Sequence, residues 1–116
     1  VMLEIADPDG SASRSYYAAF HAVSALFVLE GSTFRKHTAV EAAVHRDLAR
    51  TGRWAAELGR DFSSLAELRS TGDYGGALHV APHDARLAIA AARRILEAVR
   101  VIHPDVFPAE LQEGGD

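Results

Sequence analysis

Between Ser11 and Glu30 the sequence contains neither glycine nor proline, and its apolar residues recur every three or four positions. An α-helix turns once in about 3.6 residues, so this spacing gathers them on one face of a long helix. Asp7 and Pro8 could begin this helix earlier, as an N-cap followed by proline in the first turn, and Gly31 is the expected stop. The apolar face consists of Ala12, Tyr16, Ala19, Phe20, Val23, Leu26 and Phe27.

Two further segments with the same period follow. The second helix is predicted to begin at Thr38, where Glu41 would complete a capping box, and to end at Gly52. The third helix is predicted over 54–69, and the polar, glycine-rich residues 71–76 indicate a loop.

The last predicted helix opens at Pro82 and ends near Ile102. Its expected seam repeats at intervals of three and four residues through Ala85, Ile89, Ala92, Leu96 and Val99. No pair of strands is visible, so we expect an all-α fold, a four-helix up-and-down bundle. The residues expected to fill its core are Tyr16, Phe20, Leu26, Leu48, Phe62, Leu65, Ile89 and Leu96.

Length and composition fit one domain. The chain has 116 residues, of which 48 % are hydrophobic, and we expect a single helical domain over 1–103 and an acidic, mobile tail over 104–116. The absence of cysteine excludes a disulfide scaffold and a thiolate site. No apolar run reaches the length of a membrane span, and the first residues lack the features of a signal peptide. We therefore expect a cytoplasmic protein with no membrane partner.

The net charge of −4 conceals an uneven distribution. Seven of the sixteen acidic residues lie in the first nine positions or after Ile102, so the middle of the chain carries nine acidic against twelve basic residues. Eleven of those twelve are arginine, whose planar guanidinium binds phosphate through paired hydrogen bonds. A GC-rich genome also favours arginine, and both explanations stay open.

The six histidines indicate no metal site. His79 and His83 are four residues apart, but Pro82 between them disfavours a helix across both. There is no His-Glu-x-x-His motif, and no glycine-rich phosphate loop follows a strand. We therefore expect neither a metal nor a cofactor.

The segment from Ser13 to His21 carries the most informative chemistry. On a helix, Arg14, Tyr17 and His21 fall within about 60° of arc. Arginine can hold a phosphate bidentately and histidine can transfer a proton near neutral pH, so the three are candidate catalytic residues for phosphodiester chemistry. The same spacing also fits a purely structural role.

The residues from Ser13 to Ala22 read Ser-Arg-x-Tyr-Tyr-Ala-x-Phe-His-Ala, which resembles the signature of a large subgroup of the HEPN family of prokaryotic helical modules. The similarity runs from about Asp9 to Arg100. Its later parts are Glu30-Gly31, Phe34 to His37, Thr51-Gly52, and Leu68-Arg69 followed by Gly72-Asp73-Tyr74-Gly75.

The resemblance implies a helical bundle that pairs as a homodimer. Many relatives are metal-independent ribonucleases that use an arginine and a histidine separated by four to six residues, so the resemblance implies this activity here. Six residues lie between Arg14 and His21, the upper limit of that spacing. It also implies a toxin encoded beside a nucleotidyltransferase antitoxin, which in some pairs modifies a tyrosine of the toxin. In this reading Tyr17 positions Arg14 or His21.

Three features depart from the family pattern. Ser15 follows the arginine, where nuclease members usually carry Asn, Asp or His, and the motif lies on the first long helix instead of a later one. Relatives also usually have a full helix before this segment. Either that helix is missing from this chain, or this branch of the family folds without such a helix.

Two functions from different classes stay open. The first is an RNA-binding HEPN protein, a metal-independent ribonuclease toxin of a toxin–antitoxin or defence pair. The alternative is a non-catalytic nucleotide-binding or interaction module that docks onto a nucleotidyltransferase partner. RNA contacts are predicted at Arg35, Lys36 and His37 in the first loop, where a solvated loop is the structural alternative. They are also predicted at Arg69 and Tyr74 at the end of the third helix, where the alternative is a helix C-terminus whose dipole Arg69 meets.

Overall fold

The structure, a computed structural model, describes residues 7–74 and 79–106, and only the backbone of 72–74. Within these residues there is no strand, which confirms the all-α fold class. None of the described helices combines the length and the apolar character needed to cross a bilayer. The predicted mobile tail over 104–116 lies mostly outside the described residues, so its boundary stays a prediction.

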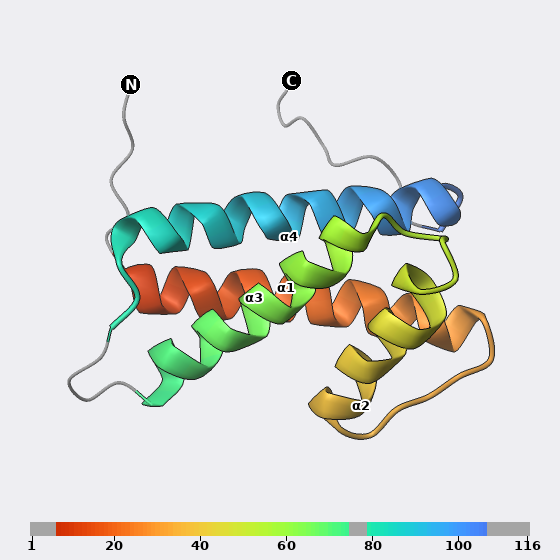
Figure 1. Ribbon diagram of the computed structural model, residues 1–116, viewed down its shortest axis with the longest axis horizontal. Coiled ribbons are helices and arrows are strands. Elements are labelled where there is room, and N and C mark those ends of the chain that lie inside the picture. The colour runs from red at the N-terminus through yellow and green to blue at the C-terminus, as the bar shows by residue number, and fades with distance from the viewer. Residues whose placement is uncertain (1–6, 75–78, 107–116) are drawn as a thin grey trace.

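In the described part of the chain, four α-helices form a bundle (Figure 1). They are α1 (Pro8–Leu29), α2 (His37–Ala43), α3 (Ala56–Tyr74) and α4 (Pro82–Ile102). α2 continues directly into a π-helical segment, η1 (Val44–Ala49), before the turn that leads to α3.

α1 and α4 lie side by side and run in the same direction, whereas α3 runs against both (Figure 1). Hydrogen bonds involving residues at or next to the ends of the two parallel helices link them at both ends. At the start, Asp9 accepts from the amide of Val80 (2.7 Å) and pairs with His79 (2.8 Å). At the end, Glu30 lies 3.4 Å from the imidazole of His103. In a strict up-and-down bundle of four helices, the first and last helices would run in opposite directions. Here α1 and α4 are parallel, because α2 and η1 form only a short arm beside the three long helices (Figure 1).

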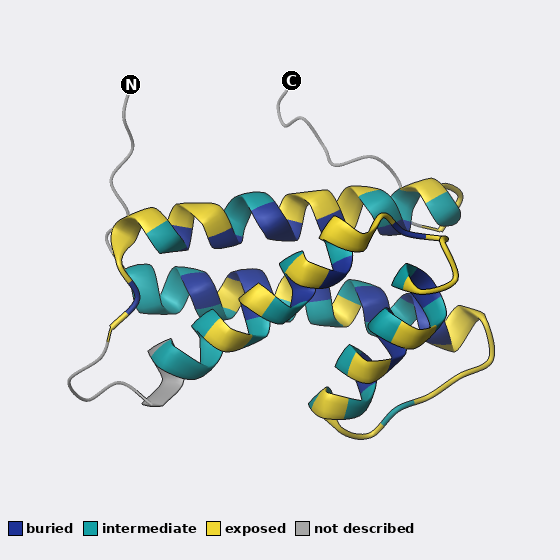
Figure 2. Ribbon diagram, viewed as in Figure 1, coloured by how far each residue is buried: buried dark blue, intermediate teal, exposed yellow. Residues whose placement is uncertain are grey.

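The core lies where α1, α3, α4 and η1 meet (Figure 2). Five of the predicted core residues are fully buried: Tyr16, Leu26, Leu48, Phe62 and Leu65. Small residues let the two parallel helices approach closely, and the buried alanines on them include Ala19, Ala88, Ala91 and Ala92. Phe20 and Ile89 are only half-buried.

The prediction that Leu96 is a core residue is wrong. Leu96 is 37 % exposed, whereas its neighbour Ile95 is fully buried. Both residues are apolar and adjacent in the chain. Periodicity alone therefore cannot decide which of the two faces the core, although one residue corresponds to about 100° around the helix. The buried side of α4 consists of Ala85, Ala88, Ala91, Ala92, Ile95 and Val99.

The beginning of α1 matches the sequence interpretation. Asp7 is the N-cap, Pro8 is in the first turn, and an Asp7 carboxylate oxygen accepts a hydrogen bond from the amide of Gly10 (3.0 Å). A Cβ at position 10 would lie 2.1 Å from the other carboxylate oxygen, so this cap requires glycine there. The stops are also as predicted, since Gly31 and Gly52 have φ of 91° and 84°, values that favour glycine.

The predicted capping box of the second helix is wrong. α2 begins at His37, and Lys36 at its N-cap makes no capping hydrogen bond through its side chain. Glu41 turns instead to α3, where it accepts a hydrogen bond from Ser63 (2.8 Å).

The predicted loop over 71–76 is also wrong for its first four residues, because α3 continues to Tyr74. The hydroxyl of Thr71 bonds to the carbonyl of Glu67 in the preceding turn (3.2 Å), and a single glycine such as Gly72 costs a helix only about 1 kcal/mol. Residues 75 and 76 lie outside the described part of the chain.

Candidate functional site

Three aromatic side chains of α1 meet a histidine from α2 and an arginine from α3. The aromatic cluster, as we call it, consists of Tyr16, Tyr17, Phe20, His37 and Arg69. The ring centroids of Tyr16 lie 5.2 Å from Tyr17 and 5.7 Å from Phe20. The cluster thus joins three segments that are far apart in the sequence.

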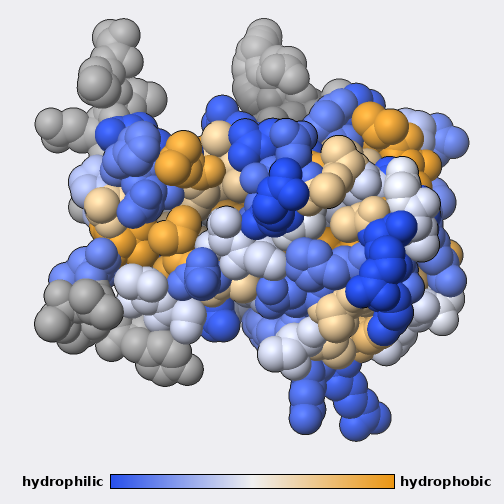
Figure 3. Space-filling view, in the orientation of Figure 1, coloured by the Kyte–Doolittle hydropathy of each residue, from blue (hydrophilic) through white to orange (hydrophobic). Residues whose placement is uncertain are grey.

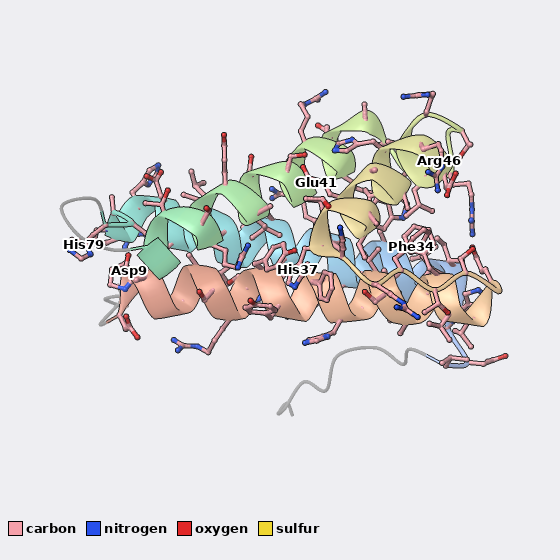
Figure 4. The ribbon with its side chains drawn as sticks, turned by 90° about the horizontal axis from the view of Figure 1, so that it is seen from below. Asp9, Phe34, His37, Glu41, Arg46 and His79 are labelled. Atoms are coloured by element: carbon pink, nitrogen blue, oxygen red, sulfur yellow. The ribbon has the colours of Figure 1, made fainter. Side chains whose placement is uncertain are left out.

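His37 contacts all three aromatic side chains of this cluster. Its imidazole is stacked on Phe20, with ring centroids 4.4 Å apart and an interplanar angle of 11°. Its Nδ1 lies 2.9 Å from the hydroxyl of Tyr16. Figure 4 shows the side chain directed from the start of α2 toward α1. The sequence placed His37 in a loop with Arg35 and Lys36, and no pattern in the sequence indicated that it would pack against α1.

Arg69 closes the cluster from α3. Its guanidinium carbon lies 5.1 Å from the centroid of Tyr16 and 5.8 Å from that of Tyr17, distances that allow cation–π attraction. Its Nη1 also donates to the hydroxyl of Tyr17 (3.4 Å). Arg69 is not near the end of its helix, because α3 extends five residues beyond it. The helix-dipole interpretation of Arg69 therefore does not apply.

Burial raises the pKa of the Tyr16 hydroxyl above its ordinary value. The positive charge of Arg69 acts in the opposite direction, and the charges of Tyr17 and Glu41 add to the increase. Tyr16 therefore stays protonated throughout the physiological range and can donate a hydrogen bond.

The predicted stripe on α1 lies at the edge of the aromatic cluster. Tyr17 belongs to the cluster, and its ring is stacked on the imidazole of His21, with centroids 6.1 Å apart and an interplanar angle of 28°. His21 and Arg14 are both exposed. The guanidinium of Arg14 turns back along the helix toward Ser11 (3.4 Å), so the structure does not bring it into contact with His21.

The other predicted contact residues have different surroundings. Arg35 and Lys36 are exposed in the segment that leads to His37, next to the aromatic cluster in the chain. Arg69 is half-buried within the cluster. The side chain of Tyr74 lies outside the described residues.

A second polar group, not expected from the sequence, joins α2, η1 and α3. The hydroxyl of Ser63 donates to Glu41 (2.8 Å) and lies 2.8 Å from Nε2 of His45. Since the one hydroxyl proton goes to the carboxylate, Nε2 of His45 must carry a proton and donate to Ser63. His45 therefore cannot activate Ser63 as a base. These residues line an open pocket of about 540 Å³, together with Arg60, Ser64, Ala66 and Glu67.

The described residues contain no group of three or more histidine, aspartate or glutamate side chains arranged to hold a metal ion. The α1 face itself presents imidazole, phenol and guanidinium groups, those of His21, Tyr17 and Arg14. These can transfer protons, donate hydrogen bonds and neutralise a phosphate.

Comparison with known proteins identifies the family. A UPF0332 protein of Thermotoga maritima is 36 % identical over 94 residues, which cover 81 % of this chain and 71 % of the relative. A UPF0332 protein of Gloeobacter violaceus is 34 % identical over 90 residues, 77 % of this chain and 71 % of the relative. No solved structure gives a significant match. The HEPN domain model matches residues 1–102, and the chain therefore belongs to the HEPN domain family.

Proposed function

We propose that this protein binds single-stranded RNA and cleaves it without a metal ion, as the toxin of a toxin–antitoxin or similar defence pair. The observation that carries the proposal is the exposed face of α1. There an accessible imidazole, His21, is stacked on Tyr17, and an accessible guanidinium, Arg14, lies two turns earlier. Membership of the HEPN family supports the same function.

In the proposed reaction the 2′-hydroxyl of RNA attacks the adjacent phosphorus, and the bond from phosphorus to the 5′-oxygen breaks. His21 accepts the proton of the attacking hydroxyl or supplies one to the departing oxygen. Arg14 stabilises the negative charge on the phosphate. Arg14 and His21 are about 10 Å apart along the helix axis, so a phosphate between them can contact both once Arg14 leaves Ser11.

The neighbouring residues suit an RNA ligand. The rings of Tyr17 and His37 provide surfaces on which unpaired bases can stack. Arg35 and Lys36 are exposed just before His37 in the chain and can contact phosphates. Tyr17 contacts both Arg69 and His21, so it positions the catalytic imidazole.

We also propose that the chain works as a homodimer. On α1, Ala18, Val28 and Leu29 are exposed, and the last two are large apolar side chains that are 57 % and 48 % accessible. Exposed apolar side chains of this size often mark a protein interface. A two-fold contact along α1 would bring the Arg14 and His21 residues of both copies onto one surface.

A second candidate function is the non-catalytic module that docks onto a nucleotidyltransferase. Apolar side chains exposed along α4, among them Leu87 and Val101, favour a protein partner on that side of the molecule (Figure 3). Both proposals allow a nucleotidyltransferase antitoxin as the partner, and cleavage of RNA separates them.

The test is cleavage of single-stranded RNA by the purified protein in the presence of a chelator. We expect products with a 2′,3′-cyclic phosphate, and no cleavage of DNA, which lacks the 2′-hydroxyl nucleophile. His21→Ala is expected to lose on the order of 10²–10⁴ in rate. Arg14→Lys is expected to lose most activity, because an ammonium group cannot bind phosphate bidentately.

Arg86→Lys, an exposed arginine on α4, is the matched control and should keep full activity. Circular dichroism must show all variants folded. If the wild type and His21→Ala degrade RNA equally, the activity is a contaminant and the catalytic function is refuted. A wild type that cleaves no RNA but binds a nucleotidyltransferase supports the second candidate.

A further inference from the structure

Two imidazoles from different segments contact the same pair of aromatic rings. His21 lies 6.1 Å from the centroid of Tyr17 and 5.4 Å from that of Phe20. His37 lies 5.9 Å and 4.4 Å from the same two centroids. Because both imidazoles contact Phe20, the distance between their centroids cannot exceed the sum of their two centroid distances to Phe20. One short stretch of RNA backbone can reach both.

The hydrogen bond between Tyr16 and His37 determines which nitrogen of His37 carries the proton. Tyr16 is almost fully buried and stays protonated, so its hydroxyl proton needs an acceptor. Nδ1 of His37 is the only hydrogen-bond acceptor that the described residues give it, since Arg69 beside the ring is purely a donor. Tyr16 therefore donates to Nδ1, and in the neutral imidazole the proton is on Nε2.

Nε2 lies on the side of the ring opposite Nδ1, and within the described part of the chain it makes no hydrogen bond. The stacking on Phe20 fixes the plane of the ring, and Tyr16 fixes its rotation. The result is a preorganised N–H donor. Arg35 and Lys36 come just before His37 in the chain, and Glu41 is one turn later on α2. Arg69 from α3 lies 5.1 Å from the ring of Tyr16, the hydrogen-bond partner of His37. These neighbours carry three positive charges and one negative charge, which favours an anionic acceptor.

We propose that His37, held by Tyr16 in the Nε2–H tautomer, donates a hydrogen bond to a non-bridging phosphate oxygen of RNA bound at His21. The inference rests on the proposed function, because RNA is the phosphate ligand in question. In this arrangement His21 transfers the proton, His37 stabilises the negative charge that grows on the phosphate oxygens, and Tyr16 is a positioning residue.

The first test measures the tautomer and does not depend on activity. Nitrogen-15 NMR of the histidine-labelled protein above pH 7 is expected to show His37 with the proton on Nε2. Tyr16→Phe, which keeps the ring but removes the hydroxyl, is expected to give a mixture of tautomers. A wild-type His37 protonated on Nδ1 would overturn the proposal, whatever the protein does to RNA.

The second test uses two isosteric substitutions. In His37→Gln the side-chain amide can place an N–H where Nε2 was. In His37→Asn the amide oxygen can still accept the Tyr16 hydrogen bond at the position of Nδ1, but no donor reaches the phosphate. We expect His37→Asn to cleave RNA on the order of 10²-fold more slowly than the wild type, as for loss of a donor to a developing oxyanion. We expect His37→Gln to recover most of that loss.

Equal activity of the Asn and Gln variants would overturn the proposal, because both would then report only on packing. The same pair is compared for binding of a single-stranded RNA whose 2′-hydroxyls are methylated, which blocks cleavage. If the wild type cleaves no RNA but binds this probe more tightly than His37→Asn, with His37→Gln between them, the cleavage function fails while the phosphate contact stands. If all three bind it equally, the phosphate contact fails as well.

Discussion

Gly59 provides a sharp test of the packing between η1 and α3. It is buried within α3, and a Cβ at this position would lie 3.0 Å from Nδ1 and 3.1 Å from Cε1 of His45. The Cβ of Ala49 would be 3.3 Å away. Two effects of Gly59→Ala therefore oppose each other. Alanine is the better helix former by about 1 kcal/mol, whereas overpacking a well-packed contact costs about 1–3 kcal/mol.

We expect the overpacking to win. His45 cannot simply turn away, because its Nε2 is bonded to Ser63 (2.8 Å) and Ser63 is in turn anchored on Glu41. Moving the imidazole would break that hydrogen bond or displace η1. Gly59→Ala should therefore lower the free energy of unfolding by up to about 2 kcal/mol, the overpacking cost less the gain in helix propensity.

The measurement is a double-mutant cycle by urea unfolding, followed by circular dichroism. In the His45→Ala background the clash with the ring is gone, and Gly59→Ala should be neutral or stabilise by up to about 1 kcal/mol. The coupling between the two sites should thus be about 1–3 kcal/mol. Ser64→Ala, at an exposed position of the same helix, controls for helix propensity without the contact.

A stabilising effect of Gly59→Ala in the wild-type background would refute the reasoning, since it would mean that η1 and α3 are not in tight contact there. An equal loss with and without the His45 ring would assign the cost to Ala49 and not to the imidazole.

Three further predictions follow from the same structure. Ile95→Ala should lower the free energy of unfolding by about 2–5 kcal/mol, and Leu96→Ala by less than about 1 kcal/mol. Equal losses in urea titrations would contradict the assignment of Ile95 to the buried side of α4. The amide of Val80 and then His79 lower the pKa of Asp9, so its stabilising contribution is present at neutral pH and is lost as the pH falls through that lowered pKa. The unfolding free energy of Asp9→Asn should therefore fall less at acid pH than that of the wild type. Asp105→Asn, at an exposed position, should behave like the wild type. The same loss at acid pH in all three proteins would contradict this contact. The chain should have the mass of a dimer in light scattering at about 10 µM, Val28→Lys should shift it toward monomer, and a monomeric wild type would contradict the proposed interface.

Local signals in the sequence predicted local structure well. The beginning of α1 was predictable because Asp7, Pro8 and Gly10 act within a single turn. The ends at Gly31 and Gly52 were predictable because both positions need a positive φ. The capping box at Thr38 and Glu41 failed because a tertiary partner, Ser63, competes for the carboxylate. That partner is invisible in the local sequence.

The candidate site was only partly predictable for the same reason. The spacing on one helix correctly placed Tyr17 beside His21. It could not show that Arg14 turns back to Ser11, because an exposed arginine chooses its rotamer from local hydrogen bonds. It also could not show that His37 and Arg69 converge on Tyr16, since that contact depends on how α2 and α3 pack against α1. The catalytic roles of Arg14, Tyr17 and His21 stay predictions.

Because α1 and α4 run in the same direction, the two ends of the bundle are different, and fluorescent labels can distinguish them. The described chain enters at one end of these helices, near Asp7, and leaves at the other, near Val106 (Figure 1). A helix of this length is roughly 30 Å long, so one dye at each position reports the span of a single copy. A dye at only one of the two positions then distinguishes head-to-head from head-to-tail pairing of two copies, because like ends meet in the first arrangement and lie a full helix length apart in the second.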